Sequence, residues 1–167
     1  MSGNNNRRIA GLTAAFQSSA LTATGAETVH DSTVAMPFCI NGKLYAKSGT
    51  NVDQTTPTTD HNTGVAFPGL VGKAAGGQGT VVVWAYNSSG TVKCMMGSIE
   101  TIDADGNFVI PPQFPYVPDD VCPFAYQVLK QQDSATTVVF GTSNWNATGF
   151  TNAINNVMQL PDRVQVA

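Results

Sequence analysis

Apolar and polar residues alternate in short runs along most of this chain, and turn-forming residues separate the runs. The clearest example is residues 36–47, where the apolar run Met-Pro-Phe-Cys-Ile is followed by Asn41-Gly42 and then by an alternating run. Asn and Gly tolerate the positive φ that two-residue hairpin turns require. The pattern therefore predicts a β-hairpin centred on Asn41 and Gly42.

The same kind of pattern predicts strands through most of the chain. Residues 80–86 are β-branched and aromatic, which predicts a central strand, and the turn at 87–90 leads into a partner strand at 91–96. The Thr-, Asn- and Gly-rich residues 48–79 predict a long surface excursion that is anchored at 65–68. Further strands are expected at 98–102, 107–110, 124–129 and 136–140.

Short strands at this spacing are typical of a sandwich or a barrel. We therefore predict an all-β protein, with a single β-sandwich or jelly-roll-like domain over residues 34–167 and an N-terminal arm over residues 1–33. The arm is polar and rich in small residues, with a weak helical spacing at Ile9, Leu12 and Phe16. We expect it to be partly extended or to form a short helix.

One segment interrupts the alternation, because residues 111–126 contain five of the nine prolines and four aromatic rings. Each proline fixes its own φ and removes a backbone donor, so no regular element is expected there. We predict a rigid strap that packs its rings over the sheet and joins the earlier half of the domain to the later half. The alternative, a Pro-x-x-Pro ligand, fits less well because such ligands lack core residues.

Composition narrows the classes of function. Charged residues make up only 11% of the chain, the net charge is −3, and the one basic cluster is Arg7-Arg8. A nucleic-acid-binding face needs many Lys and Arg on one surface, so nucleic acid is not an expected partner. No apolar run approaches membrane-spanning length, and no signal-peptide core follows Arg7-Arg8, so we expect a soluble, unprocessed chain without a membrane partner.

Candidate reactive groups are weakly supported. His30-Asp31-Ser32 supplies the residue types of a catalytic triad, but residues adjacent in sequence have the wrong geometry for one. His61 has no second histidine at metal-ligand spacing. Asp103-Ala-Asp-Gly resembles a calcium loop, but its glycine comes too early and the closing Glu is missing, so it is typical of a hairpin turn.

The cysteines are few and far apart. No Cys-x-x-Cys spacing occurs, and each cysteine lies in an apolar run, which indicates small buried hydrophobes rather than disulfides or reactive thiols. They are Cys39, Cys94 and Cys122. Together with the weak motifs above, this predicts a protein that is not an enzyme, with no catalytic residue, no cofactor and no metal ligand.

Residues 134–161 contain no charged side chain, although they are rich in Asn and Thr. Interface cores are depleted in charge and enriched in aromatic residues, so this segment is a candidate contact with a partner. Its candidate interface residues are Phe140, Trp145, Phe150 and Ile154. Ordinary core packing explains the same composition equally well. Trp145 lies between two asparagines and would alternatively form a sugar platform, or simply a buried tryptophan at a tight turn.

Four motifs, in this order, resemble small virion proteins of tailed bacteriophages that are thought to decorate or cement the head. They are Ile40-Asn-Gly-Lys-Leu-Tyr-Ala-Lys, Val117-Pro-Asp-Asp-Val-Cys-Pro-Phe-Ala-Tyr, Gly141-Thr-Ser-Asn-Trp-Asn-Ala-Thr-Gly and Leu160-Pro-Asp-Arg-Val-Gln-Val. The resemblance covers roughly residues 34–167 and leaves the arm unmatched. It provides no catalytic residues.

The resemblance implies a β-rich, self-associating domain, with a trimer favoured, that binds the major capsid protein. The chain would then be located on the capsid surface of a virion that is assembled in the host cytoplasm. The alternative function is a carbohydrate- or receptor-binding β-sandwich of a tail fibre or similar appendage, which would use Trp145 and also Trp84.

Overall fold

A computed structural model describes residues 11–47, 51–133 and 136–165 and has no helix among them. The all-β prediction is confirmed, while the choice between a sandwich and a jelly roll stays a prediction. The strands are β1 (Ala14–Ala15), β2 (Leu21–Thr22), β3 (Val29–Ser32), β4 (Met36–Ile40), β5 (Lys43–Lys47), β6 (Asn51–Thr55), β7 (Gly69–Val71), β8 (Gly77–Asn87), β9 (Val92–Met96), β10 (Glu100–Ile102), β11 (Val121–Gln131), β12 (Thr137–Val139) and β13 (Phe150–Asn156).

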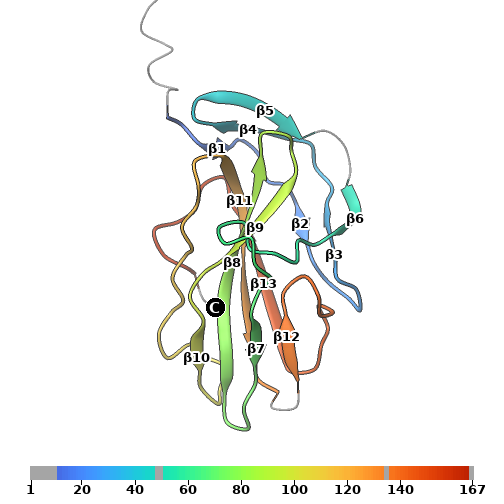
Figure 1. Cartoon of the computed structure of the whole chain (residues 1–167), viewed down its shortest axis with the longest axis vertical. Helices are drawn as coiled ribbons and strands as arrows, with labels where there is room; N and C mark the ends of the chain where they lie inside the picture. Colours follow the sequence, from blue (N-terminus) through green and yellow to red (C-terminus); the bar gives the residue numbers. More distant parts are fainter. Residues whose placement is uncertain (1–10, 48–50, 134–135, 166–167) are drawn as a thin grey trace, which may run out of the picture.

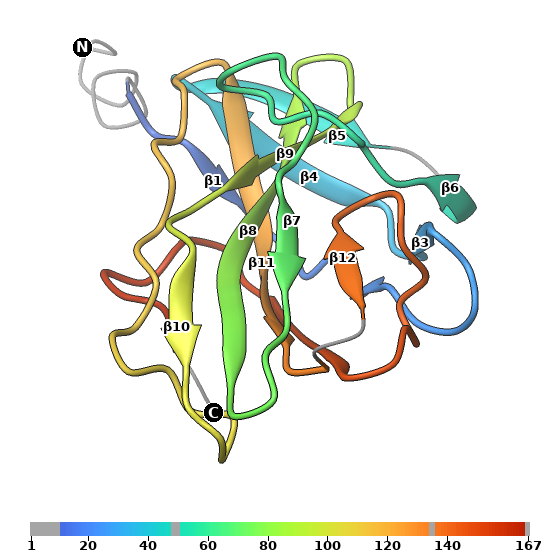
Figure 2. The ribbon, with the colours of Figure 1, turned by 60° about the horizontal axis from the view of Figure 1, so that its bottom comes forward.

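The two long strands β8 and β11 pair antiparallel and form the centre of the main sheet. On the side of β8 away from β11, β10 pairs with the start of β8 and β9 pairs with its second half. On the side of β11 away from β8, β13 pairs with β11. Three small antiparallel sheets complete the fold: β1-β4-β5, β2-β3-β6 and β7-β12. In Figures 1 and 2, β4 and β5 cross one end of the long strands, while β3 and β6 lie to one side.

Strand β8 is apolar over residues 81–86 because both of its faces are covered there. Side chains alternate between the two faces of a strand, so Val82, Trp84 and Tyr86 face one core while Val81 and Val83 face another. The first core, between the main sheet and the small sheets, is the larger. The second is closed by segments 108–117 and 157–164, which pack on the opposite face of the main sheet. The prediction of a central strand at 80–86 is confirmed.

Strand β11 corrects the prediction that no regular element passes through residues 111–126. The strand begins at Val121 and runs through Pro123, where its register with β8 shifts between Pro123 and Ala125. The pairing with β13 starts only at Ala125, so the missing N–H of Pro123 breaks no ladder on that side. The shift also changes which residues face the larger core, from Cys122 and Phe124 before it to Ala125 and Leu129 after it.

The irregular part of this segment, residues 111–120, is the strap. Its expected packing on the sheet is present at Phe114, whose ring lies edge-on to Tyr126 with centroids 5.2 Å apart. The Gln113 carbonyl oxygen accepts a hydrogen bond from the Ser98 backbone N–H, which fixes the strap beside β10. The expectation that all four rings are covered is wrong for Tyr116, which is 73% exposed.

The hairpins predicted at residues 36–47 and 80–96 are confirmed, whereas the strand predicted at 107–110 is absent and only an isolated bridge joins Ile102 to Phe108. β4 and β5 pair around Asn41 and Gly42, whose φ angles are 49° and 79°, as a two-residue turn of this kind requires. β8 and β9 pair around the turn at 87–90. The long excursion at 48–79 is less irregular than expected, because it contributes β6 and β7 to two small sheets; Phe67, in the predicted anchor, is buried.

Much of the predicted N-terminal arm belongs to the sheets. Residues 11–33 contain β1, β2 and β3, and both Ala15 and Leu21 are buried in the larger core. Leu12 and Phe16, two of the three residues with helical spacing, lie outside any helix, on either side of β1. Ile9 lies outside the described residues.

Candidate interaction surface

The predicted interface residues lie mainly inside the domain. Phe140, Trp145 and Phe150 are only 2%, 3% and 8% exposed and belong to the larger core. Their rings pack in sequence, with Phe140 edge-on to Trp145 at 5.6 Å and Trp145 stacked on Phe150 at 6.5 Å. Ile154, on β13, is half-buried against the same core. The first three side chains therefore offer no exposed surface to a partner, which favours the core explanation of this segment.

The sugar-platform hypothesis is not supported by the two tryptophans. Trp145 Nε1 donates a hydrogen bond to the Val29 carbonyl oxygen at 2.7 Å, and Trp84 Nε1 donates one to Gln127 Oε1 at 3.1 Å. Both indoles are buried. A sugar stacks on an exposed ring face, and neither tryptophan presents one.

The uncharged segment uses its asparagines to hold its own fold together. Asn152 Oδ1 accepts a hydrogen bond from Gln127 Nε2, and Asn152 Nδ2 donates one to the Trp145 carbonyl oxygen. Asn156 Oδ1 accepts from the Leu21 N–H, and its Nδ2 donates to the Leu21 carbonyl oxygen, so its side chain acts as a strand partner for β2. A neutral amide can both donate and accept at such a position, whereas a carboxylate or an ammonium group cannot.

A different segment presents apolar side chains to solvent. Val109 and Ile110 are 65% and 63% exposed, and the exposed Pro111 and Tyr116 follow them on the strap. We call Val109, Ile110, Pro111 and Tyr116 the strap surface. No charged residue lies between Asp105 and Asp119, so the strap surface belongs to a stretch without charge.

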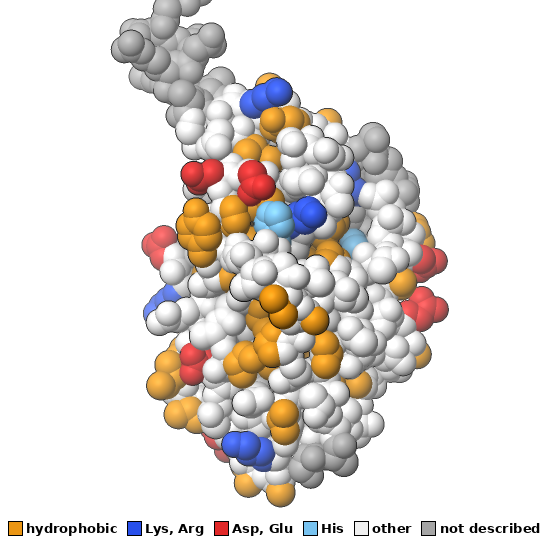
Figure 3. Space-filling model, in the orientation of Figure 1, with side chains coloured by type: hydrophobic (Ala, Val, Ile, Leu, Met, Phe, Trp, Pro, Cys, Tyr) orange, Lys and Arg blue, Asp and Glu red, His pale blue; other side chains and the backbone are white. Residues whose placement is uncertain are grey.

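Sequence reasoning missed the strap surface because it assumed that the strap rings would be buried. The signal was available: apolar residues that lie next to one another, as in Val109-Ile110, cannot all point to one side of an extended chain. Figure 3 shows one face of the molecule, where neutral polar atoms dominate, charged side chains are scattered, and apolar ones gather near the centre and at the left edge.

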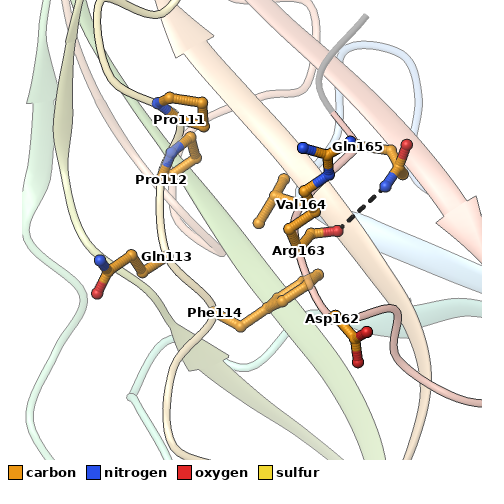
Figure 4. A pocket seen from close by; sticks show the side chains of 8 residues that line it. All are labelled: Pro111, Pro112, Gln113, Phe114, Asp162, Arg163, Val164 and Gln165. Carbon is orange, nitrogen blue, oxygen red and sulfur yellow. Dashed lines mark hydrogen bonds between the residues drawn. The ribbon is translucent and has the colours of Figure 1, made fainter.

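A groove of about 640 Å³ lies beside the strap surface. Residues 111–114 of the strap line one side and residues 162–165 of the C-terminal segment line the other (Figure 4). Pro111 belongs to both the groove and the strap surface. An exposed apolar surface next to a groove is typical of a protein-binding site, because both increase the apolar area that a partner can cover.

Two residues of the apparent triad, His30 and Ser32, belong to a buried polar cluster instead. Ser32 Oγ lies 3.0 Å from the Tyr86 hydroxyl, and the Lys47 amine contacts Ser32 Oγ and donates to the Ser32 carbonyl oxygen at 3.0 Å. His30 Nδ1 is 3.3 Å from Thr56 Oγ1. Asp31 points elsewhere and accepts a hydrogen bond from the Asp53 N–H. No Ser-His-Asp geometry results.

Burial determines the protonation of this cluster. It lowers the pKa of His30 to about 4, with the nearby Lys47 charge acting in the same direction, and it lowers the pKa of Lys47. It raises the pKa of Tyr86 to about 12. A serine between an amine and a phenol has the residue types of an activated nucleophile. Ser32 and Tyr86 are fully buried, however, so in this structure the cluster is closed to a substrate.

The remaining candidate motifs are structural in the part of the chain that is described. Asp103 Oδ1 accepts hydrogen bonds from the backbone N–H groups of Asp105 and Asn107, which confirms a turn. Cys39, Cys94 and Cys122 are all buried and free, as predicted. Burial raises the pKa of Cys122 to about 12, and it also raises the pKa of Cys94.

No group of three or more potential metal-ligating side chains (His, Cys, Asp or Glu) occurs among the residues described. None of these residues forms a helix of the length and hydrophobicity needed to cross a membrane. In comparisons with known proteins, no family model, curated protein or solved structure matches this chain.

Proposed function

We propose that this chain is a structural virion protein that binds the outside of a tailed-phage head and stabilises it, without catalysis. The observation that carries this proposal is the strap surface, where apolar side chains are exposed on a segment without charge. Prolines hold the strap in one conformation, so covering it costs little conformational entropy. Such a surface suits a permanent contact with another protein.

The proposed partner is the major capsid protein, as the resemblance of the sequence motifs to head decoration proteins implies. A protein that binds only the assembled shell stabilises that shell by mass action and needs no chemical step. The scarcity of charge is consistent with this role, because an apolar contact needs no matching pattern of charges on the capsid. The chain would be added to the head in the host cytoplasm and remain on the virion.

We also propose that the chain is a homo-oligomer, with a trimer favoured. This again follows from the resemblance to self-associating head proteins. The mass of the protein in solution and on the head would test it, and a chain that is monomeric in both would contradict it.

Two measurements test the proposed function. Mass spectrometry of purified virions should find this chain in a fixed ratio to the major capsid protein. Its absence from complete particles would contradict the proposal. In the second measurement, purified chain is added to heads that lack it and is recovered with them by sedimentation.

A matched pair of variants makes the second measurement specific to the strap surface. Ile110→Asp places a charge in the proposed contact and should abolish sedimentation with the heads, because a desolvated, unpaired carboxylate is costly. Leu44→Asp makes the same chemical change on β5, at a side chain that is 68% exposed, and should bind like the wild type. Equal binding by both variants would show that the strap surface is not part of the contact with the head.

The alternative of a carbohydrate-binding module of a tail fibre loses its specific support, since Trp84 and Trp145 are both buried. A glycan array is still an informative control. Saturable binding to one glycan would favour a receptor-binding function over the decoration of heads.

A further inference from the structure

A second groove lies at the other end of the strap, next to the turn that follows β13. Its volume is about 280 Å³, and its lining is mostly apolar, including Val117, Pro123, Met158 and Leu160. Val117 and Leu160 also pack on the smaller core, while Met158 is largely exposed. The one charged residue in the lining is Asp119. A short apolar segment with positive charge would complement this groove.

The charge distribution of the chain provides such a segment. Asp119 and Asp120 are the only two adjacent acidic residues in the sequence, and both are exposed. Arg7 and Arg8 are the only two adjacent basic residues, and Ile9 and Ala10 follow them. Without the two arginines, the chain has six basic and eleven acidic residues, a net charge of −5.

The two carboxylates are not neutralised by a lysine or arginine in any ion pair of the described residues. Asp120 Oδ2 lies 3.7 Å from His61 Nε2, which is charged only when protonated. The exposed acidic pair therefore gives the rim of the groove a negative potential.

The start of the described chain lies at this groove. Thr13 is part of the lining, and its Oγ1 accepts a hydrogen bond from the Asn41 N–H at 3.1 Å. Asn41 Nδ2 in turn donates to the Asp119 carbonyl oxygen at 3.0 Å. Arg8 is five residues before Thr13, and five extended residues span at most about 17 Å. The arginines can therefore reach the acidic pair.

We propose that this groove is a peptide-binding site for the chain's own N-terminal sequence. Ile9 matches the apolar lining in chemistry, and Arg7 and Arg8 match Asp119 and Asp120 in charge. Because the sequence is tethered beside the groove, its effective concentration is in the millimolar range and weak contacts are sufficient. This site is distinct from the strap surface and goes beyond the proposed contact with the capsid.

Trypsin cleavage of the full chain tests the proposal, because trypsin cuts after Arg7 and Arg8 and a bound segment is protected. Intact-mass spectrometry follows the loss of the N-terminal peptide. The double variant Asp119→Asn and Asp120→Asn should be cleaved about fivefold faster than the wild type, the effect expected of two exposed charge contacts. Met158→Gln, which makes the lining polar, should also speed cleavage.

In about 0.5 M NaCl, where charges are screened within a few ångströms, the difference between the wild type and the acidic-pair variant should disappear.

The matched control is the double variant Asp53→Asn and Asp105→Asn, which removes the same charge from two exposed residues on β6 and on the turn after β10. It should be cleaved at the wild-type rate. Equal rates for the wild type, the acidic-pair variant and Met158→Gln would overturn the proposal. Protection of the wild type that grows with protein concentration would also overturn it, since the groove would then hold the N-terminal sequence of a second copy.

Discussion

Trp145 Nε1 donates a 2.7 Å hydrogen bond to the carbonyl oxygen of Val29, a residue 116 positions earlier in the chain. The backbone N–H groups of Trp145 and Asn146 also donate, to the carbonyl oxygens of Glu27 and Gly25. The connection between β12 and β13 is thereby fixed to the segment that leads into β3. The core depends on this contact, because the Trp145 ring lies between Phe140 and Phe150.

We therefore expect Trp145→Ala to lower the free energy of unfolding by about 3–5 kcal/mol, from the lost burial and the cavity left behind. Trp145→Phe should cost less, because it mainly removes the hydrogen bond to Val29. Tyr116→Ala, at an exposed ring on the strap, should change stability by less than about 0.5 kcal/mol. Urea unfolding of the three variants would measure this order, and a stable Trp145→Ala protein would contradict it.

The lowered pKa of His30 predicts that the folded protein loses stability in acid. Its folded-state pKa is about 4, below its ordinary value of 6.5, so the unfolded chain binds a proton more readily than the folded one. The stabilisation by neutral His30 is complete above pH 6.5 and is lost as the pH falls towards 4. The loss is about 3 kcal/mol at most.

Urea unfolding between pH 7 and pH 4 should show this dependence in the wild type. His30→Gln should be less stable at pH 7 but should lose less stability on acidification. His61→Gln replaces the half-buried second histidine and is the matched control, which should keep the pH dependence of the wild type. Parallel pH profiles for the wild type and His30→Gln would show that other groups cause the acid effect.

Substitution of two glycines would distinguish the cost of backbone strain from the cost of steric overlap. Gly64 and Gly141 both have positive φ, at 69° and 73°. A Cβ on Gly64 would meet no atom within 4 Å, whereas a Cβ on Gly141 would lie 2.2 Å from the Pro57 carbonyl oxygen. Gly64→Ala should cost about 1 kcal/mol from φ alone, and Gly141→Ala clearly more, because its neighbour is backbone that cannot move aside easily. Equal costs in urea unfolding would contradict this assignment.

The sequence predicted the elements that depend on local chemistry. Asn41-Gly42 indicated its hairpin because few other dipeptides adopt positive φ at both residues, and the β-branched and aromatic run at 80–86 indicated a central strand. Strand β13 was not predicted, because Asn152, Asn155 and Asn156 are unfavourable in strands by propensity. The amides of Asn152 and Asn156 contact β11 and β2 across long sequence distances, and no local pattern reveals such partners.

Composition could not separate the core and interface explanations of residues 134–161 for a related reason. Absence of charge at residues 134–161 is a property of composition, and a core and an interface share it. Only the fold shows that Phe150 is buried within the chain itself. Phe150→Asp should therefore unfold the domain, rather than only disrupt association as the sequence-based hypothesis requires.

Binding of the chain to phage heads should survive high salt. The strap surface lies in a stretch with no charged residue between Asp105 and Asp119, so its contact rests on apolar burial, which contributes about 25 cal/mol per Å². Attraction between charges is screened over about 8 Å at physiological ionic strength and over shorter distances as salt rises. Apolar burial is not screened in this way. Sedimentation with heads from about 0.1 to 1 M NaCl should therefore recover the same amount of wild-type chain, whereas protection of Arg7 and Arg8 from trypsin should decline over the same range. Release of the chain at moderate salt would show that ion pairs, and not the strap surface, hold it on the head.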